Sequence, residues 1–371
     1  IKMNIVENKE AINDFIDCVI EISDSVNSDN WNGEDVMGIF FNEFNRYKKK
    51  SESGQVFTPD HITSLMYKIL EVNANDKILD AACGSGAFLV KSMSNMIKEV
   101  GGINTKEAKK IKEHSLFGIE FDREIFALAC ANMMIHKDGK TNLEQLDSRD
   151  KEASEWIKSK GITKVLMNPP FERKYGCKKI VENVLNSVPS GIKCAFIMPE
   201  KKMEKDKMGK LLEKHHLEAI IKLPEKLFDA GVTTRIYVFE TGKKQVGEIY
   251  GCYIEDDGLE RVKNQGRQDI KDKWMELENY WVDSIRKRND TKYGTSQWID
   301  PKKFLSYQKP KAEFVLYEED FVKTMMNYLM FKNKIDVKEF SDKLINKTLY
   351  NSEILKEDNN IVIKIKDAED E

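Results

Sequence analysis

Four apolar segments of this sequence each end on a polar side chain, and this recurrence constrains the fold more than any other feature. The segments end at Asp80, Glu120, Asp147 and Asn168, and helical stretches follow the first two. Strands that alternate with helices form parallel sheets. Because open α/β sheets bind ligands at the carboxyl ends of their strands, we expect these four side chains along one edge of the sheet.

A turn of small residues follows the first segment. Residues 77–80 indicate a short strand, residues 81–86 contain two glycines, and an apolar helix then begins. Glycine lets the backbone approach a ligand, and a helix N-terminus offers unpaired N–H groups. Only one G-x-G is present, so a nucleoside without phosphates suits the turn better than a dinucleotide. The interval from Asp80 to Glu120 exceeds the ~20 residues usual before a ribose-binding acid, which we attribute to an inserted helix at residues 106–113.

The fourth segment ends in a stiff loop, Asn168-Pro169-Pro170-Phe171. Two successive prolines fix their own φ angles and donate no backbone N–H. Asn168 can accept a hydrogen bond through its side-chain oxygen, the proline carbonyls are acceptors, and Phe171 offers a face to a flat ring. These groups suit an exocyclic amino group on a purine. Taken alone, the loop fits an ordinary proline turn equally well.

Length and composition set broader limits. The 371 residues, 40% hydrophobic and 33% charged, predict one large α/β domain with helical appendages, or two domains. No run approaches the ~18 apolar residues of a membrane span, and no signal-peptide pattern opens the sequence, so we expect a cytoplasmic protein. Six separated cysteines predict reduced thiols and no structural metal. A net charge of −3 gives no global attraction to nucleic acid, so DNA binding would need local basic patches or a partner.

Helical periodicity is also found before Asp80 and after Asn168. Residues 1–30 and 31–47 predict N-terminal helices, and Thr58 or Asp60 is placed to cap a third helix. Residues 320–334 predict an amphipathic helix that either packs on the domain or binds a partner helix. Several basic residues are either phosphate contacts or a solvated face. They are Arg261, Lys263, Arg267, Arg286, Lys287 and Arg288.

The order of the motifs resembles a known family of enzymes. Residues 54–59, 80–88 and 168–171 follow one another as in the amino-group DNA methyltransferases, and they are most similar to the modification (M) subunits of type I restriction-modification systems. The resemblance covers residues 31–242. Ala81 departs from it, since the family usually has proline there.

This resemblance implies a fold and a division into domains. The implied fold is α/β, the Rossmann-like class I fold of S-adenosylmethionine-dependent methyltransferases, with a seven-stranded mixed sheet. Residues 1–53 would form a short N-terminal helical segment and residues 54–255 the methyltransferase domain. Residues 256–371 would form a partly helical C-terminal extension that contacts a partner or DNA.

The resemblance also implies roles for individual residues. Phe57, Thr58 and Pro59 would hold the methionine end of S-adenosylmethionine, Glu120 the ribose hydroxyls and Asp147 the adenine amino group. The full implied cofactor set is Phe57, Thr58, Pro59, Asp80, Ala82, Cys83, Gly84, Gly86, Phe88, Glu120, Phe121, Asp147, Ser148 and Asn168. The implied catalytic residues are Asn168, Pro169, Pro170 and Phe171. No metal is implied.

Chemistry agrees with these roles. Methyl transfer from a sulfonium is strongly downhill, so the enzyme needs alignment rather than a metal. The exocyclic amine is a poor nucleophile because its lone pair is delocalised into the ring. Asn168 and the Pro169 carbonyl would accept its hydrogens and stabilise the developing positive charge, while Phe171 stacks on the flipped base. The similar enzymes that methylate cytosine N4 usually have Ser at the position of Asn168, so the asparagine favours adenine N6.

The predicted function is therefore methylation of adenine N6 in double-stranded DNA. No self-contained recognition domain is evident after Gly242, so we expect a separate specificity subunit to choose the site, with a restriction subunit as a further partner. A protein glutamine methyltransferase is one alternative, although that family typically has Tyr where this chain has Phe171. An RNA adenine methyltransferase and a catalytically silent scaffold subunit are the others.

Overall fold

The structure is a computed structural model. It describes residues 8–45, 58–137, 142–171, 176–200, 209–225, 227–228, 232–262, 266–302, 307–308, 318–350, 352–357 and 360–365. The chain divides into two compact units, residues 1–310 and residues 311–371. The sequence-based boundaries at residues 53 and 255 stay a prediction.

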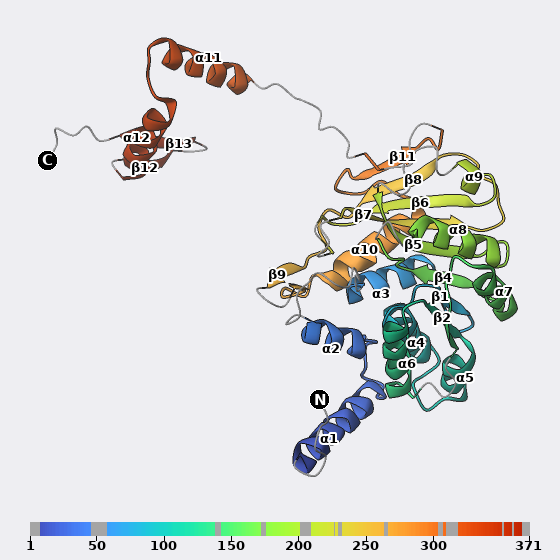
Figure 1. Cartoon of the computed structure of the whole chain (residues 1–371). Helices are drawn as coiled ribbons and strands as arrows, with labels where there is room; N and C mark the ends of the chain where they lie inside the picture. Colours follow the sequence, from blue (N-terminus) through green and yellow to red (C-terminus); the bar gives the residue numbers. More distant parts are fainter. Residues whose placement is uncertain are drawn as a thin grey trace. The chain divides into compact units, whose positions relative to one another are not determined.

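A single mixed sheet organises the first unit, with strand order β11-β8-β6-β7-β5-β4-β1-β2-β3 (Figure 1). The strands from β3 to β5 run parallel, and β7 lies antiparallel between β5 and β6. The predicted α/β class with a mixed sheet is confirmed. Within the part of the chain that the structure describes, the sheet has nine strands rather than the expected seven, because β8 pairs with β6 and β11 pairs with β8. The strands are β1 (Ile78–Asp80), β2 (Leu116–Glu120), β3 (Leu143–Gln145), β4 (Lys164–Met167), β5 (Lys193–Pro199), β6 (His216–Lys222), β7 (Thr234–Glu240), β8 (Ile249–Tyr253) and β11 (Ser296–Ile299).

Helices cover both faces of this sheet. Alternate residues of a strand point to opposite faces, so Leu166 joins the core under α3, α4, α5, α6 and α10, while Val165 and Met167 join the core under α7, α8 and α9. The strands read as continuous apolar runs because both faces are buried. The helices of the first unit are α1 (Lys9–Val26), α2 (Val36–Asn45), α3 (Asp60–Ile69), α4 (Ala87–Glu99), α5 (Lys106–His114), α6 (Arg123–Ile135), α7 (Lys151–Lys160), α8 (Cys177–Ser187), α9 (Gly209–Leu212) and α10 (Trp274–Lys287). The first unit also contains a two-stranded hairpin, β9 (Glu260–Val262) with β10 (Gly266–Gln268).

Local signals fixed several of these elements. The inserted helix predicted at residues 106–113 is α5, whose N-cap Thr105 accepts a hydrogen bond from the Ala108 backbone N–H. Asp122 caps α6 in the same way. Two expectations were wrong. The N-cap of α3 is Pro59, so neither Thr58 nor Asp60 caps it, and β3 ends at Gln145, so Asp147 lies in the loop beyond the strand.

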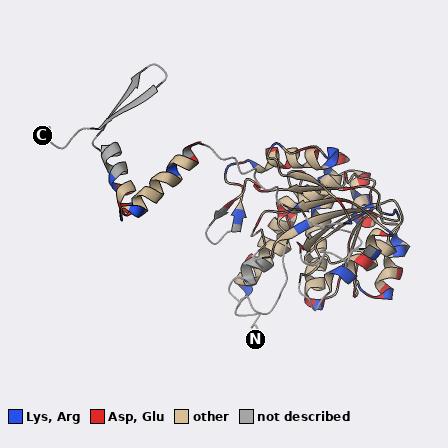
Figure 2. Cartoon of the chain, turned by 90° about the horizontal axis from the view of Figure 1, so that it is seen from above, with Lys and Arg blue, Asp and Glu red and all other residues tan. Residues whose placement is uncertain are grey.

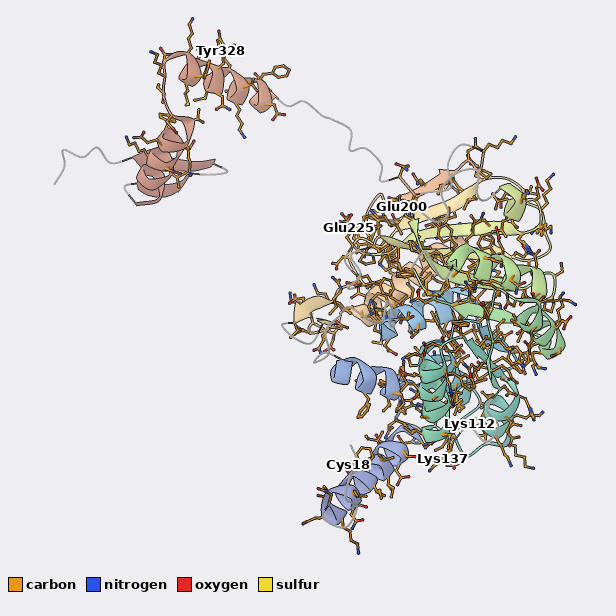
Figure 3. All side chains as sticks on the ribbon, viewed as in Figure 1. Cys18, Lys112, Lys137, Glu200, Glu225 and Tyr328 are labelled. Carbon is orange, nitrogen blue, oxygen red and sulfur yellow. The ribbon has the colours of Figure 1, made fainter. Side chains whose placement is uncertain are left out.

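The N-terminal segment contacts the domain at several points. The amide of Asn27 donates to the Ile135 carbonyl at 2.8 Å, and Lys112 donates to the side chain of Asn27 at 3.2 Å. Lys137 pairs with Asp24 at 3.5 Å, and both lysines lie beside the C-terminal end of α1 (Figure 3). The rest of α1 extends away from the sheet (Figure 1). Five of its apolar side chains are exposed. They are Phe15, Ile16, Val19, Ile20 and Ile22.

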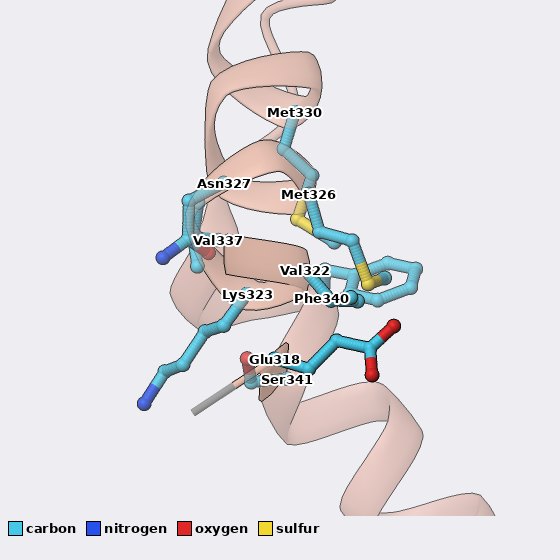
Figure 4. Close-up of a pocket in the computed structure, with 9 residues that line it drawn as sticks. All are labelled: Glu318, Val322, Lys323, Met326, Asn327, Met330, Val337, Phe340 and Ser341. Carbon is cyan, nitrogen blue, oxygen red and sulfur yellow. The ribbon is translucent and has the colours of Figure 1, made fainter. Parts of the chain in front are cut away.

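The second unit contains two helices and a hairpin. They are α11 (Glu318–Lys332), α12 (Val337–Tyr350), β12 (Ser352–Glu357) and β13 (Asn360–Ile365). One face of α11 meets α12 around an open pocket that Met326, Met330 and Phe340 line (Figure 4). Other apolar side chains of α11 stay largely exposed, Phe331 at 79% and Phe321 at 62%. For residues 320–334, packing on the domain and binding to a partner helix both stay predictions.

The basic residues are less available than the sequence suggested. Lysine and arginine are interspersed with acids along the helices of the first unit (Figure 2). Arg267 pairs with the buried Asp257, and Arg286 donates to the Lys68 carbonyl. Lys263 and the side chain of Arg261 lie outside the described residues. Among the described helices, none is long and apolar enough to cross a lipid bilayer.

Candidate active site at the carboxyl edge of the sheet

The strand ends that the sequence singled out meet in one pocket. Its walls come from the turn after β1, the end of β2, the loop after β3 and the loop after β4. The lining residues are Thr58, Asp80, Ala81, Ala82, Cys83, Gly84, Ser85, Ala87, Phe88, Glu120, Phe121, Asp122, Ile125, Asp147, Ser148, Arg149, Asn168, Pro169, Pro170 and Ile180. The glycine turn and the Asn168 loop therefore share one cleft.

The turn between β1 and α4 depends on two glycines. Gly84 and Gly86 have φ angles of 55° and 97°, in the region that L side chains rarely adopt. The backbone N–H of Gly84 donates to Oε2 of Glu120 at 3.0 Å, so the end of β2 holds the turn. The space beside Gly84 is open, since a Cβ there would meet no described atom within 4 Å. A ligand can thus approach the backbone closely at this point.

Two carboxyl groups lie together beneath the turn. Burial, with a further contribution from Glu120, raises the pKa of Asp80 to about 8. Burial also raises the pKa of Glu120, although backbone N–H groups of Asp122 and Gly84 donate to its carboxylate and oppose that shift. Asp80 accepts from the Ala82 backbone N–H at 3.1 Å. This end of the pocket is therefore rich in hydrogen-bond acceptors.

Asp147 has a different environment. Its carboxylate accepts from the Arg149 backbone N–H at 2.9 Å and from the Arg149 guanidinium. These hydrogen bonds lower the pKa of Asp147. The guanidinium also lies 5.9 Å from the centre of the Phe121 ring. Next to it, Ser148 donates to the Ala81 carbonyl at 2.5 Å and joins this loop to the glycine turn.

Asn168 lines the pocket and carries an unpaired acceptor. Its Nδ2 donates to Thr58 Oγ1 at 2.9 Å, so Thr58, two residues before the start of α3, orients the amide. Its Oδ1 is buried and has no hydrogen-bond partner among the described residues. A buried, unpaired amide oxygen costs free energy unless a ligand donates to it. The side chain is thus arranged to accept a hydrogen bond from something in the pocket.

Most of the predicted site residues come together, and a few do not. Pro59 and Gly86 adjoin the pocket without lining it, and Phe57 lies outside the described residues. Phe171 is only 9% exposed and packs edge-on against Phe228, with ring centroids 5.5 Å apart. Its stacking role stays a prediction.

Sequence reasoning missed seven lining residues. They are Ala81, Ser85, Ala87, Asp122, Ile125, Arg149 and Ile180. The position of Arg149, two residues after Asp147, is compatible with a local ion pair and could have indicated it. Ile180 of α8 gave no local signal, because only the packing of that helix brings it to the pocket.

The fold agrees with the methyltransferase fold that the resemblance implied. The strands run in the order β3-β2-β1-β4-β5-β7-β6, with β7 antiparallel. The pocket lies at the carboxyl ends of the parallel strands, where open α/β sheets bind their ligands.

Comparison with known proteins shows what the chain resembles. Residues 32–189 match the family described as N-6 DNA Methylase. It is 30% identical over 340 residues to the type II restriction enzyme and methyltransferase RM.BcgI of Heyndrickxia coagulans, covering 84% of this chain and 51% of that protein. It is 22% identical over 215 residues to the methylase subunit of the type I restriction enzyme EcoEI of Escherichia coli, covering 52% of this chain and 43% of that subunit. The resemblance that the motifs indicated is confirmed.

A solved structure has the same fold. It is described as a modification subunit of a type I restriction enzyme from Vibrio vulnificus YJ016, and it superposes with a TM-score of 0.56 at 18% identity, over 74% of this chain and 63% of that one. The chain spans about half the length of the curated relatives it matches.

Proposed function

We propose that this chain transfers a methyl group from S-adenosylmethionine to the N6 amino group of adenine in DNA, as the modification subunit of a restriction-modification system. One observation carries the proposal. Asn168, whose buried Oδ1 has no hydrogen-bond partner among the described residues, lines the same pocket as the open glycine turn. An acceptor for an amine and a cradle for a donor therefore face one cleft.

The residues present fit the cofactor. S-adenosylmethionine, when bound, would supply an electrophilic methyl group. Gly84 leaves room for the backbone to approach it, and Asp80 and Glu120 offer carboxyl oxygens for hydroxyl and amino groups. Asp147, or the adjacent Ser148, would receive the adenine amino group, with Phe121 and Ile180 as apolar walls. The complete set of cofactor roles given by the motifs is part of this proposal.

The chain's own contribution to chemistry is alignment and electrostatic stabilisation. Asn168 Oδ1 and the Pro169 carbonyl would accept the two hydrogens of the target amine. Both acceptors are fixed before reaction, Asn168 by its hydrogen bond to Thr58 and Pro169 by its ring. Such fixed dipoles stabilise the positive charge that grows on the nitrogen. The pocket can admit the base only if it is flipped out of the duplex, and Phe171 is the candidate for stacking on it.

The substrate and partners follow from the relatives. Both named relatives belong to restriction enzymes, and one is the methylase subunit of a type I enzyme. We propose double-stranded DNA as the substrate, a separate specificity subunit as the reader of the site and a restriction subunit as a further partner. Site-specific methylation by this chain alone would refute the need for a specificity subunit.

Methyl transfer from labelled S-adenosylmethionine tests the enzyme assignment. The full chain is incubated with unmethylated DNA, RNA or protein extract, with and without a candidate specificity subunit. We expect label on adenine N6 of DNA only. In Asn168→Ala we expect transfer to fall about a hundredfold or more, as when one fixed oxyanion donor is removed, with cofactor affinity nearly unchanged.

Asn186→Ala is the matched control. Asn186 is an exposed asparagine of α8 whose amide donates to the Glu182 carbonyl within the same helix. It should transfer methyl groups like the wild type. If Asn168→Ala is as active as the wild type, Asn168 has no catalytic role. If the label appears on RNA or on protein glutamine, the substrate is that molecule and not DNA.

A further inference from the structure

Asp35, in the N-terminal segment, contacts the glycine turn. Its carboxylate accepts from Ser85 Oγ, from Asn132 Nδ2 at 2.8 Å and from the Gly38 backbone N–H at 2.8 Å. Ser85 lines the pocket and lies 50 residues further along the chain than Asp35. The N-terminal segment therefore touches the wall of the site and not only the outside of the domain.

Ser85 lies at the most adaptable point of the turn. It is flanked by Gly84 and Gly86, which both have positive φ angles. Three elements fix this stretch: Glu120 accepts from the Gly84 N–H, Asn132 of α6 donates to the Ser85 carbonyl at 2.8 Å, and Asp35 accepts from the Ser85 hydroxyl. Asp35 is the contact that comes from outside the sheet and its crossover helices.

The start of α2 is shaped for this contact. A Cβ at Gly38 would clash with the Asp35 carboxylate and lie 2.9 Å from Ser85 Oγ. Only glycine lets the backbone N–H of residue 38 reach the carboxylate while the serine stays in place. Burial raises the pKa of Asp35.

We propose that Asp35 is a positioning residue for the cofactor. By holding Ser85, it fixes the glycine turn in the conformation that receives S-adenosylmethionine, so this one contact from the N-terminal segment sets cofactor affinity. A turn fixed before binding loses less conformational freedom when the ligand arrives. The inference rests on the proposed function, because it requires S-adenosylmethionine to bind at this turn.

Isothermal titration of the full chain with S-adenosylmethionine tests it. Asp35→Ala removes a hydrogen bond to a charged acceptor and should raise Kd about tenfold. Methyl transfer should show a raised KM for the cofactor with kcat near the wild-type value. Asp35→Asn keeps one oxygen for Gly38 and Asn132 and lets Ser85 reorient to accept, so it should restore Kd to within about threefold of wild type.

Asp29→Ala is the matched control. Asp29 belongs to the same segment and accepts from the Ile103 backbone N–H at 2.8 Å, at the loop after α4 rather than at the pocket. It should leave Kd unchanged. Thermal unfolding shows whether each variant folds. If Asp35→Ala does not fold, Ser85→Ala removes the same contact while Asp35 keeps its hydrogen bonds from Gly38 and Asn132, and it should also raise Kd about tenfold; an unchanged Kd would overturn the positioning role.

The outcomes separate the two proposals. A wild-type chain that does not bind S-adenosylmethionine overturns the proposed function itself. A wild-type chain that binds, together with an Asp35→Ala variant of equal affinity, overturns only the positioning role. Equal weakening in Asp35→Ala and Asp29→Ala also overturns it, since docking of the segment would then act without the contact to Ser85.

Discussion

Single residues of this pocket differ in what their surroundings do to them. Asp80 ends β1 and Asp147 lies in the loop after β3, yet burial raises the pKa of Asp80 whereas hydrogen bonds from Arg149 lower the pKa of Asp147. Asn168 combines a satisfied amide nitrogen with an unsatisfied oxygen. Identical functional groups thus acquire different chemistry from their neighbours, which is typical of functional sites.

Asp80 makes the stability of the protein depend on pH. Its pKa is about 8 in the folded chain, against an ordinary value of 3.8. The folded state holds the proton more tightly than the unfolded state. The contribution of this carboxyl group to folding stability is therefore complete below about pH 4 and is lost as the pH rises from 4 to 8. In Asp80→Asn, which keeps an oxygen for the Ala82 N–H, we expect that fall to disappear. Urea unfolding at several pH values measures it, and parallel curves for both proteins would contradict the shift.

At the scale of elements, the turn between β1 and α4 links stability to binding. Its glycines allow backbone angles that other residues reach only with strain, and Glu120 holds it from the neighbouring strand. The loop after β4 is stiff for the opposite reason, since its prolines have few conformations to lose. A glycine turn fixed by contacts and a proline loop fixed by its rings both line the pocket.

Gly84→Ala should separate the two effects of this turn. Alanine at a φ of 55° costs about 1–2 kcal/mol of folding free energy. Its Cβ would also enter the open space beside the turn, so S-adenosylmethionine should bind about tenfold more weakly or worse. Gly294→Ala is the control, because Gly294 has a φ of 62° and equally open surroundings but lies away from the pocket. It should lose similar stability in urea unfolding and bind as the wild type does; weaker binding in both variants would point to strain alone.

At the scale of the whole molecule, the two compact units differ in how much apolar surface they bury. Both core clusters lie within residues 1–310. The described helices of residues 311–371 instead expose many large apolar side chains, Phe331 and Phe321 among them. Exposed apolar patches of this kind promote association.

Truncation after Pro310 should therefore leave the pocket intact. We expect a thermal midpoint within about 2–4 °C of the full chain, which corresponds to a change of no more than about 1 kcal/mol, and unchanged affinity for S-adenosylmethionine. Self-association, measured by analytical ultracentrifugation, should decrease. A truncated chain that loses cofactor binding would show that the second unit supports the site.

Much of this protein was determined by its sequence alone. The α/β class followed from apolar runs that alternate with helices, and the pocket followed from polar residues at strand ends, because parallel strands bring their carboxyl ends to one edge wherever the intervening helices lie. Asp80, Glu120 and Asn168 meet there as expected. Local order along the chain was sufficient for these predictions.

Only the tertiary structure decided the contacts between distant segments. The packing of Phe171 on Phe228, the approach of Ile180 and the hydrogen bond of Asp35 to Ser85 join residues far apart in the sequence. Strand β11 extended the sheet further because β8 had an unpaired edge. Such contacts depend on how the elements pack, and no local pattern of residues encodes them.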